Sequence, residues 1–148
     1  MRNFGPILIA EDNDMDLELT LEALKSLNLT NEIIVVRDGA EALDFFFLRG
    51  KFEERDASMN PVVALLDIKM PKVTGIEVLE VIKQDQNLKD IPIVMLTSSR
   101  EDKDIRKCYD FGVNAFVVKP VDFDQFNEAI KAIGLFWGVS NETPNKSN

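Results

Sequence analysis

Five short, continuously apolar runs divide this sequence, and they constrain its fold more than any other feature. Each run lacks charged residues and contains β-branched side chains. Such runs fit strands that are buried on both faces, as in a parallel sheet covered by helices on each side. The predicted strands are Pro6–Ala10, Ile33–Val36, Val62–Leu66, Ile93–Leu96 and Ala115–Val118.

The segments between these runs carry apolar residues at helical spacing. Strands that alternate with helices predict an α/β protein, in which a parallel five-stranded sheet is joined by right-handed crossovers. The polar stretch from Lys51 to Pro61 is expected to be a long exposed loop. The predicted helices start near Asp14, at Asp38–Gly39, near Gly75, near Glu101 and at the N-cap Asp122, and the second, fourth and fifth end near Gly50, Gly112 and Trp137.

Length and composition narrow the class of protein. The 148 residues allow one domain with a substantial core, expected over residues 1–137 and followed by a short polar tail at 138–148. The net charge of −9 argues against nucleic-acid binding through a basic surface. The absence of histidine excludes a Ser-His-Asp or Cys-His hydrolase and a His-ligated zinc site.

The cellular location is predicted from the cysteine content and the apolar segments. A single cysteine, Cys108, cannot form an internal disulfide, which indicates a reducing compartment. Met1–Gly5 lead into the first strand without a secretory leader, and no apolar run is long enough to span a bilayer. We therefore expect a cytoplasmic protein.

Polar residues capable of chemistry follow four of the five predicted strands. In an open parallel sheet, ligands bind beyond the carboxyl ends of the strands, so these residues are expected to converge at one edge. They are Glu11 and Asp12 after the first strand, Asp67 after the third, Thr97 and Ser98 after the fourth, and Lys119 and Pro120 after the fifth.

Three carboxylates at one edge require a positive partner, because they repel one another and lose part of their hydration. Lys119 supplies one positive charge, and Mg²⁺, which prefers carboxylate, carbonyl and water ligands, would supply two. A hydroxyl and an ammonium that can hold anionic oxygens match phosphoryl transfer, in which a carboxylate can itself accept the group. Each of these residues alone is common in a solvated turn or helix cap, so the combination carries the prediction.

Two other interpretations of the first acidic segment make different predictions. Asp12, Asp14 and Asp16 have the opening spacing of an EF-hand loop, but Leu17 and Ala23 stand where that loop needs Gly and Glu. The segment Asp-Asn-Asp also resembles the nucleophile motif of haloacid-dehalogenase-type phosphohydrolases. The late strand ends in Lys-Pro rather than in an acidic pair, and the chain has no room for a cap domain, so this enzyme class stays an alternative.

The ends of four strands together resemble two-component response-regulator receiver domains of the chemotaxis-regulator type. The resemblance covers residues 6 to 137 and implies a flavodoxin-like, doubly wound (βα)5 fold with strand order 2-1-3-4-5. It also implies a signalling phosphoacceptor rather than an enzyme. The segments that carry the resemblance are Ile7–Asp14, Leu65–Gly75, Met95–Ser98 and Val117–Pro120.

The resemblance implies that Asp67 accepts a phosphoryl group from a histidine kinase or a phosphotransfer protein. Mg²⁺ would be bound directly by Asp12 and Asp67 and by the carbonyl of Lys69. Glu11 would contribute to the metal site mostly through water. Lys69 itself departs from the small polar residues common at this position in receivers, which implies an altered phosphoryl lifetime.

The remaining residues of the edge would hold the phosphoryl group and report its presence. Thr97 and Lys119 would bind the phosphoryl oxygens. Thr97 would then move toward the phosphoryl group, and Phe116 would be the switch aromatic that turns inward. The Lys119–Pro120 peptide bond is expected to be cis.

More narrowly, the long link after the second helix and the ending Ile-Gly-Leu-Phe136-Trp137 resemble phytochrome-associated response regulators of bacteria. This implies a phytochrome-like kinase and a homodimer formed through the strand-five and helix-five face with Phe136 and Trp137. Eleven residues after Trp137 leave no space for an output domain, so we expect signalling through protein contacts rather than nucleic acid or membrane. A receiver-like scaffold that works without phosphorylation is the second alternative, against which Lys119 and the three carboxylates argue.

Overall fold

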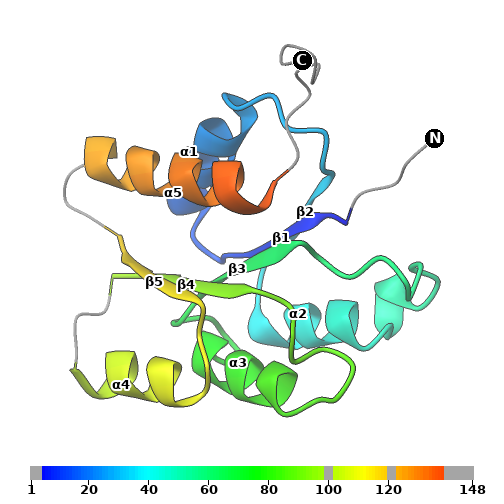
Figure 1. The fold of residues 1–148 in the computed structure, drawn as a ribbon. Coiled ribbons are helices and arrows are strands. Elements are labelled where there is room, and N and C mark those ends of the chain that lie inside the picture. The colour runs from blue at the N-terminus through cyan, green and yellow to red at the C-terminus, as the bar shows by residue number, and fades with distance from the viewer. Residues whose placement is uncertain (1–4, 99–101, 120–122, 139–148) are drawn as a thin grey trace.

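The computed structural model describes residues 5–98, 102–119 and 123–138, and within them the predicted alternation of strands and helices is confirmed (Figure 1). Five parallel strands form one sheet in the order β2-β1-β3-β4-β5, the order that the resemblance implied. The strands are β1 (Ile7–Ala10), β2 (Ile33–Val36), β3 (Val63–Asp67), β4 (Ile93–Thr97) and β5 (Ala115–Val118). The helices are α1 (Asp14–Lys25), α2 (Gly39–Phe46), α3 (Gly75–Lys83), α4 (Asp102–Asp110) and α5 (Phe123–Trp137), with a 3₁₀ turn, η1, at Gly50–Phe52.

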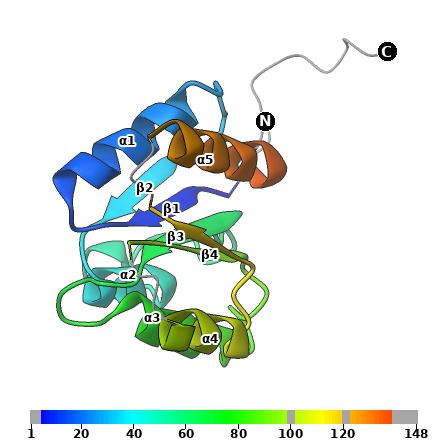
Figure 2. The ribbon, with the colours of Figure 1, turned by 90° about the vertical axis from the view of Figure 1, so that its left-hand side faces the viewer.

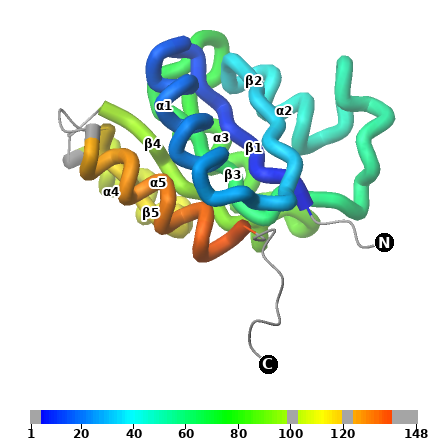
Figure 3. The backbone as a smooth tube through the Cα atoms, turned by 90° about the horizontal axis from the view of Figure 1, so that it is seen from above, coloured from blue at the N-terminus to red at the C-terminus, as the bar shows by residue number. Residues whose placement is uncertain are grey.

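Helices cover both faces of the sheet, with α1 and α5 on one face and α2, α3 and α4 on the other (Figures 1 and 2). Seen from above, α1 and α5 lie side by side on the same face of the sheet (Figure 3). Side chains alternate along each strand: Leu8 and Met95 join the core beneath α2, α3 and α4, whereas Ile9 and Val94 join the core beneath α1 and α5. Burial on both faces explains why the strand sequences are continuously apolar. In the described ranges, none of the helices combines the length and the apolar character needed to cross a membrane.

Three helices begin at the carboxyl edge of the sheet with a side chain that caps the free backbone amides. Asn13 accepts a hydrogen bond from the Asp16 amide at 2.9 Å before α1, and Asp38 accepts one from the Glu41 amide at 2.7 Å before α2. Thr74 and the first-turn glutamate of α3 form a reciprocal capping box. These caps fix the loops that follow β1, β2 and β3, which are the loops that carry candidate functional residues.

The structure moves several predicted boundaries. β3 is shifted by one residue relative to its prediction and β4 is longer by one, so Asp67 and Thr97 lie on the sheet itself rather than in the following loops. α2 ends at Phe46, before the predicted stop at Gly50. The predicted N-cap of the last helix, the predicted cis Lys119–Pro120 bond and residues 139–148 of the predicted tail lie outside the described residues.

The link from Lys51 to Pro61 is exposed along much of its length, as predicted, but part of it packs against α2. The ring of Phe52 lies edge-on against Phe45 with 5.1 Å between centroids. The guanidinium of Arg55 lies 4.2 Å above the Phe45 ring and donates a hydrogen bond to the Phe45 carbonyl at 3.0 Å. An aromatic ring and a guanidinium inside a polar segment hold the link against α2, because both groups gain by stacking.

Candidate functional site

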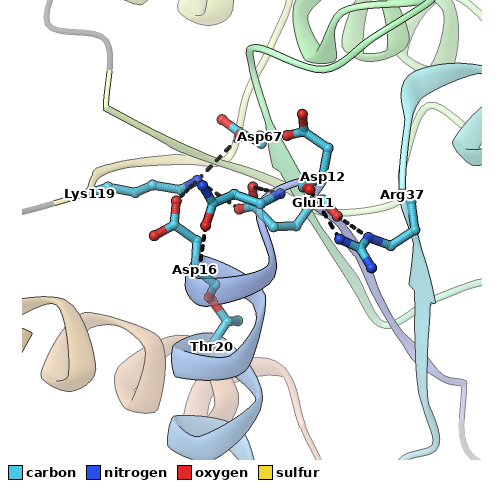
Figure 4. Close-up of polar contacts among 8 residues, drawn as sticks. Glu11, Asp12, Asp16, Thr20, Arg37, Asp67 and Lys119 are labelled. Carbon is cyan, nitrogen blue, oxygen red and sulfur yellow. Dashed lines mark hydrogen bonds and ion pairs between the residues drawn. The ribbon is translucent and has the colours of Figure 1, made fainter.

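Four of the predicted site residues meet at the carboxyl edge of the sheet (Figure 4). Glu11 and Asp12 follow β1, Asp67 ends β3, and Lys119 follows β5. β3 is the central strand and pairs with β1 on one side and β4 on the other. The parallel topology therefore brings side chains from distant parts of the sequence to one place, as predicted.

The ammonium of Lys119 lies at the centre of this group, and the Lys119 side chain is only 10 % exposed. Its Nζ atom donates to Oε1 of Glu11 at 2.7 Å, to Oδ2 of Asp16 at 2.9 Å and to Oδ2 of Asp67 at 3.2 Å. All three ammonium protons therefore have a carboxylate acceptor. Such charge-assisted hydrogen bonds hold a lysine side chain in one orientation far better than a neutral contact does.

Glu11, Asp12 and Asp67 form an acidic cluster, in which each residue offers one carboxylate oxygen and these oxygens lie within 4.8 Å of one another. Glu11 and Asp67 are buried, and Asp12 is exposed on the open side of the acidic cluster. Carboxylate oxygens at this spacing are the ligand set of a hard divalent cation such as Mg²⁺. The residues present therefore fit the metal that the sequence predicted.

Burial and neighbouring charges shift the pKa values of Glu11 and Lys119. Burial raises the pKa of Glu11 to about 7, and the charge of Asp67 adds to the shift while Lys119 opposes it. Burial alone would lower the pKa of Lys119, but its hydrogen bonds to Glu11 and Asp16 and the charge of Asp67 outweigh this and raise it. Lys119 thus remains a cation, as a group that is to bind anionic oxygens must.

Thr97 lies on β4, next to the strand that carries Asp67, whereas Phe116 lies one strand further out, on β5. Thr97 is fully buried at the end of β4, and its carbonyl accepts a hydrogen bond from the Lys119 amide at 2.7 Å. Phe116 lies on β5, is half-buried, and packs against the core beneath α2, α3 and α4. Lys69 is exposed beyond the end of β3.

The loop after β3 returns tightly against Asp67. The Gly75 amide donates to the Ile68 carbonyl at 2.9 Å, and this brings the start of α3 next to the end of β3. A Cβ atom on Gly75 would lie 2.1 Å from the carbonyl oxygen of Asp67, a distance that no side chain tolerates. Glycine at this position is therefore a packing requirement of the site.

Sequence reasoning missed two residues of this edge, Asp16 and Arg37. Asp16 lies in the first turn of α1 and adds a further carboxylate to Lys119. Arg37 follows β2, and its Nε atom donates to the Glu11 carbonyl at 2.8 Å while Nη2 donates to the Asp12 carbonyl at 3.0 Å (Figure 4). The only available signal was positional, because Arg37 occupies the end of the strand that carried no predicted site residue.

The last helix ends in exposed apolar side chains. Phe136 is 76 % exposed and Leu135 is 66 % exposed. Trp137 packs against the core beneath α1 and α5, and its ring meets that of Phe136 edge-on at 4.8 Å. Trp137 therefore faces the core, whereas Phe136 faces the surface.

Comparison with known proteins adds independent observations. The sequence profile of the family described as "Response regulator receiver domain" matches residues 7–131. The chain is 37 % identical to the response regulator Rcp1 of Synechocystis sp. over 131 residues, and this alignment covers 88 % of this chain and 87 % of Rcp1. It is similar to the solved structure of the Mn²⁺-bound form of Rcp1, with a TM-score of 0.84, 34 % identity, and 94 % and 97 % of the two chains covered. It is also similar to the structure of the bacteriophytochrome response regulator RtBRR, with a TM-score of 0.79, 54 % identity, and 97 % and 86 % covered.

Proposed function

Because this chain belongs to the response-regulator receiver family, whose members are signalling phosphoacceptors rather than true enzymes, we propose that Asp67 is the residue that accepts the phosphoryl group. One observation carries the proposal. The Asp67 carboxylate ends the central strand, lies 3.2 Å from the Lys119 ammonium, and shares its surroundings with the carboxylates of Glu11 and Asp12. No other carboxylate in the described part of the chain combines these neighbours with a central strand end.

We propose that the acidic cluster binds Mg²⁺, with the carbonyl of Lys69 as an additional ligand. The 4.8 Å grouping of carboxylate oxygens supports this, and the related protein Rcp1 was crystallised with Mn²⁺. When bound, the metal neutralises charge on the transferring phosphoryl oxygens. Glu11 is held on two sides, because Oε1 accepts from Lys119 and Oε2 accepts from the Asn13 amide at 3.2 Å.

In the proposed reaction, a carboxylate oxygen of Asp67 attacks the phosphorus of a phosphohistidine on a partner kinase. The bond between phosphorus and the imidazole nitrogen breaks, the electron pair stays on that nitrogen, and an acyl phosphate forms on Asp67. Lys119 and the Thr97 hydroxyl then bind the new phosphoryl oxygens. Since the sequence contains no histidine, the donor imidazole comes from the partner.

The proposed switch couples this new charge to β4 and β5, the strands that carry Thr97 and Phe116. Phosphorylation adds negative charge and acceptor oxygens at Asp67, and Thr97 moves toward them. Phe116, half-buried on the adjacent strand, turns further inward and fills the space that Thr97 leaves. Such a change shifts the balance between two pre-existing arrangements of the face made by α4, β5 and α5 rather than creating a new one.

The identity of the kinase is proposed from the relatives. The receiver family implies a histidine kinase as partner, and RtBRR is named as a bacteriophytochrome response regulator. We propose a phytochrome-like histidine kinase for this chain. A panel of phosphorylated histidine kinases, one of them a phytochrome, tests this through the initial rate of phosphoryl transfer to Asp67. Equal or faster transfer from unrelated kinases would contradict it.

We also propose that a second copy of this chain covers the apolar end of α5. The adjacent exposed side chains of Leu135 and Phe136 support this, because a second copy would bury both around a twofold axis. Light scattering over a range of concentrations should give a dimer mass for the unsubstituted protein and a monomer mass for Phe136→Asp. Val81→Lys, which changes an exposed apolar residue on α3, serves as the control. A monomer mass at every concentration, with and without beryllium trifluoride, would overturn this assembly.

The phosphoacceptor itself is tested by incubation with acetyl phosphate and Mg²⁺, followed by intact-mass measurement. The unsubstituted protein should gain one phosphoryl group that hydroxylamine removes, since an acyl phosphate is sensitive to this nucleophile. Asp67→Asn should gain none, whereas the control Asp110→Asn, at an exposed site on α4, should be labelled normally. Normal labelling of Asp67→Asn would show that another residue is the acceptor.

A further inference from the structure

Arg37 connects the end of β2 to the segment that carries two of the three carboxylates of the acidic cluster. Its Nε atom donates to the Glu11 carbonyl at 2.8 Å, and Nη2 donates to the Asp12 carbonyl at 3.0 Å. The same Nη2 atom forms an ion pair with Asp14 at the start of α1. One side chain thus contacts three positions of the turn between β1 and α1, and Figure 4 shows Arg37 beside two of them, Glu11 and Asp12.

The hydrogen bond from Arg37 is one of several contacts that restrain Glu11. The Glu11 amide donates to the Val36 carbonyl at 3.0 Å, which extends the pairing between β1 and β2 by one residue. Its carbonyl is held by Arg37 and its carboxylate by Lys119 and the Asn13 amide. Asp12 is the next residue, and the Arg37 hydrogen bond to its carbonyl is the contact that restrains its backbone from the β2 side.

Arg37 is itself anchored to α2. Its amide donates to Oε1 of Glu41 at 2.8 Å, and the Glu41 amide donates in turn to the cap residue Asp38 at 2.7 Å. The Glu41 carboxylate also forms an ion pair with Lys51 of the 3₁₀ turn. The start of α2 therefore fixes the backbone from which the arginine reaches the turn after β1.

We propose that Arg37 is a positioning residue for metal binding: by fixing the backbone of Glu11 and Asp12, it sets the spacing of the carboxylates that receive the cation. This inference rests on the metal site of the proposed function. Arg37 is not a catalytic residue, because its contacts are with backbone carbonyls and with Asp14 outside the acidic cluster. The planar guanidinium suits this task, since two of its N–H groups can reach two neighbouring carbonyls at once.

Two roles for Arg37 predict opposite effects on metal affinity. A positive charge near a cation site weakens binding through repulsion, so a purely electrostatic role predicts that Arg37→Gln binds Mg²⁺ more tightly and that Arg37→Lys is unchanged. A positioning role predicts that both variants bind Mg²⁺ more weakly, because neither side chain reproduces the two hydrogen bonds. Loss of an outer-shell partner typically costs about 10-fold to 100-fold in metal affinity.

The experiment is calorimetric titration of Mg²⁺ into the full chain and into three variants. We expect Arg37→Gln and Arg37→Lys each to weaken binding about tenfold. Arg49→Gln serves as the matched control, because Arg49 is exposed, its ion pair with Asp44 is long at 3.6 Å, and it touches no residue of the acidic cluster. Circular dichroism of each variant before titration confirms that the fold is retained, and Arg37→Lys provides the test if Arg37→Gln does not fold.

Each outcome decides between the inferences. Equal Mg²⁺ affinity in the unsubstituted protein and both Arg37 variants would overturn the positioning role and leave the metal site standing. Tighter binding by Arg37→Gln with an unchanged Arg37→Lys would also overturn it in favour of charge. A lack of Mg²⁺ binding by the unsubstituted protein would overturn the metal site of the proposed function, and the role of Arg37 with it.

Discussion

The Lys119 ammonium lies 2.9 Å from Oδ2 of Asp16, so a carboxylate outside the acidic cluster shares the lysine with Glu11 and Asp67. Asp16 comes from the first turn of α1, whereas Lys119 follows β5, and 103 residues separate them along the chain. A phosphoryl group on Asp67 must therefore bind Lys119 in the presence of one more negative charge than the acidic cluster itself supplies. This relationship makes Asp16 a determinant of how strongly the site holds anions.

We predict that Asp16→Asn increases the affinity for beryllium trifluoride, a phosphoryl mimic, in the presence of Mg²⁺. The substitution removes a negative charge next to Lys119 and so weakens the repulsion of the incoming anion. Because the Asp16 side chain is partly exposed, we expect an increase of about threefold, well below the value for a buried charge. Titration of beryllium trifluoride followed by calorimetry measures the change.

Glu18→Gln is the matched control, since it removes a charge of the same sign from an exposed position of α1. Its affinity for the mimic should match that of the unsubstituted protein. If Asp16→Asn instead binds beryllium trifluoride more weakly, Asp16 acts by holding Lys119 in place, and the repulsion argument is wrong.

A second prediction concerns the charge balance of the site without metal. Lys119→Met leaves Glu11, Asp67 and Asp16 without their shared ammonium, so the free energy of unfolding should fall by about 3 kcal/mol. Saturating Mg²⁺ should reduce this loss, because the cation supplies positive charge to the same carboxylates. Denaturant unfolding with and without Mg²⁺ measures both effects.

Lys25→Met, at an exposed position near the end of α1, controls for the general effect of replacing a lysine by methionine. Its stability should be unchanged within experimental error. If the Lys119→Met protein is as stable as the unsubstituted one in the absence of Mg²⁺, Lys119 does not offset a destabilising repulsion among the carboxylates, and the prediction is wrong.

The sheet and most of the site were predictable because they depend on local patterns that the fold preserves. Continuously apolar strands require burial on both faces, and parallel strands bring their carboxyl ends to one edge. Glu11, Asp67 and Lys119 each stand directly at such an end, so their meeting follows from topology alone. No side-chain detail was needed to predict it.

Asp16 and Arg37 escaped prediction because their roles depend on side-chain reach rather than on strand ends. Asp16 lies on a helix, where an acidic residue in the first turn is ordinarily explained by the helix dipole. Arg37 donates to backbone carbonyls, and since every residue has one, the sequence does not reveal these acceptors. The packed link around Arg55 was missed for a related reason, since stacking on Phe45 depends on a ring in a different element.

A third prediction tests the tight return of the chain against Asp67. Gly75→Ala places a methyl group 2.1 Å from the Asp67 carbonyl oxygen, so either β3 or the start of α3 must shift. We expect a loss of stability of about 2 kcal/mol or more and slower phosphorylation by acetyl phosphate, because the shift displaces Asp67. Thermal unfolding and the rate of mass gain measure the two effects.

Gly50→Asn provides the comparison, since Gly50 has a φ of +59°, a conformation that asparagine accepts, and its nearest neighbour is the flexible Asp44 side chain. This variant should phosphorylate at the normal rate. If Gly75→Ala also phosphorylated normally while losing stability, the glycine would matter for folding and not for the placement of Asp67.

The last prediction concerns Cys108, which is fully buried on α4. Burial, with a smaller contribution from Asp104, raises the pKa of its thiol from the usual value near 9 to about 11. The thiol therefore stays neutral in the folded protein while it ionises in the unfolded chain above pH 9. The stability that this difference contributes is fully present below pH 9 and is lost as the pH rises through 11, by roughly 1.4 kcal/mol for each unit between the two pKa values.

Denaturant unfolding between pH 8 and pH 10.5 measures this loss, with Cys108→Ala as the reference, because other groups titrate equally in both proteins. Cys108→Ala should be less stable at pH 8 through lost packing, and the gap should narrow as the pH rises. A thiol reagent at pH 8 should modify the folded unsubstituted protein only as fast as it opens. A constant gap across this pH range, or immediate modification, would mean that the thiol is accessible to solvent and that α4 does not seal it.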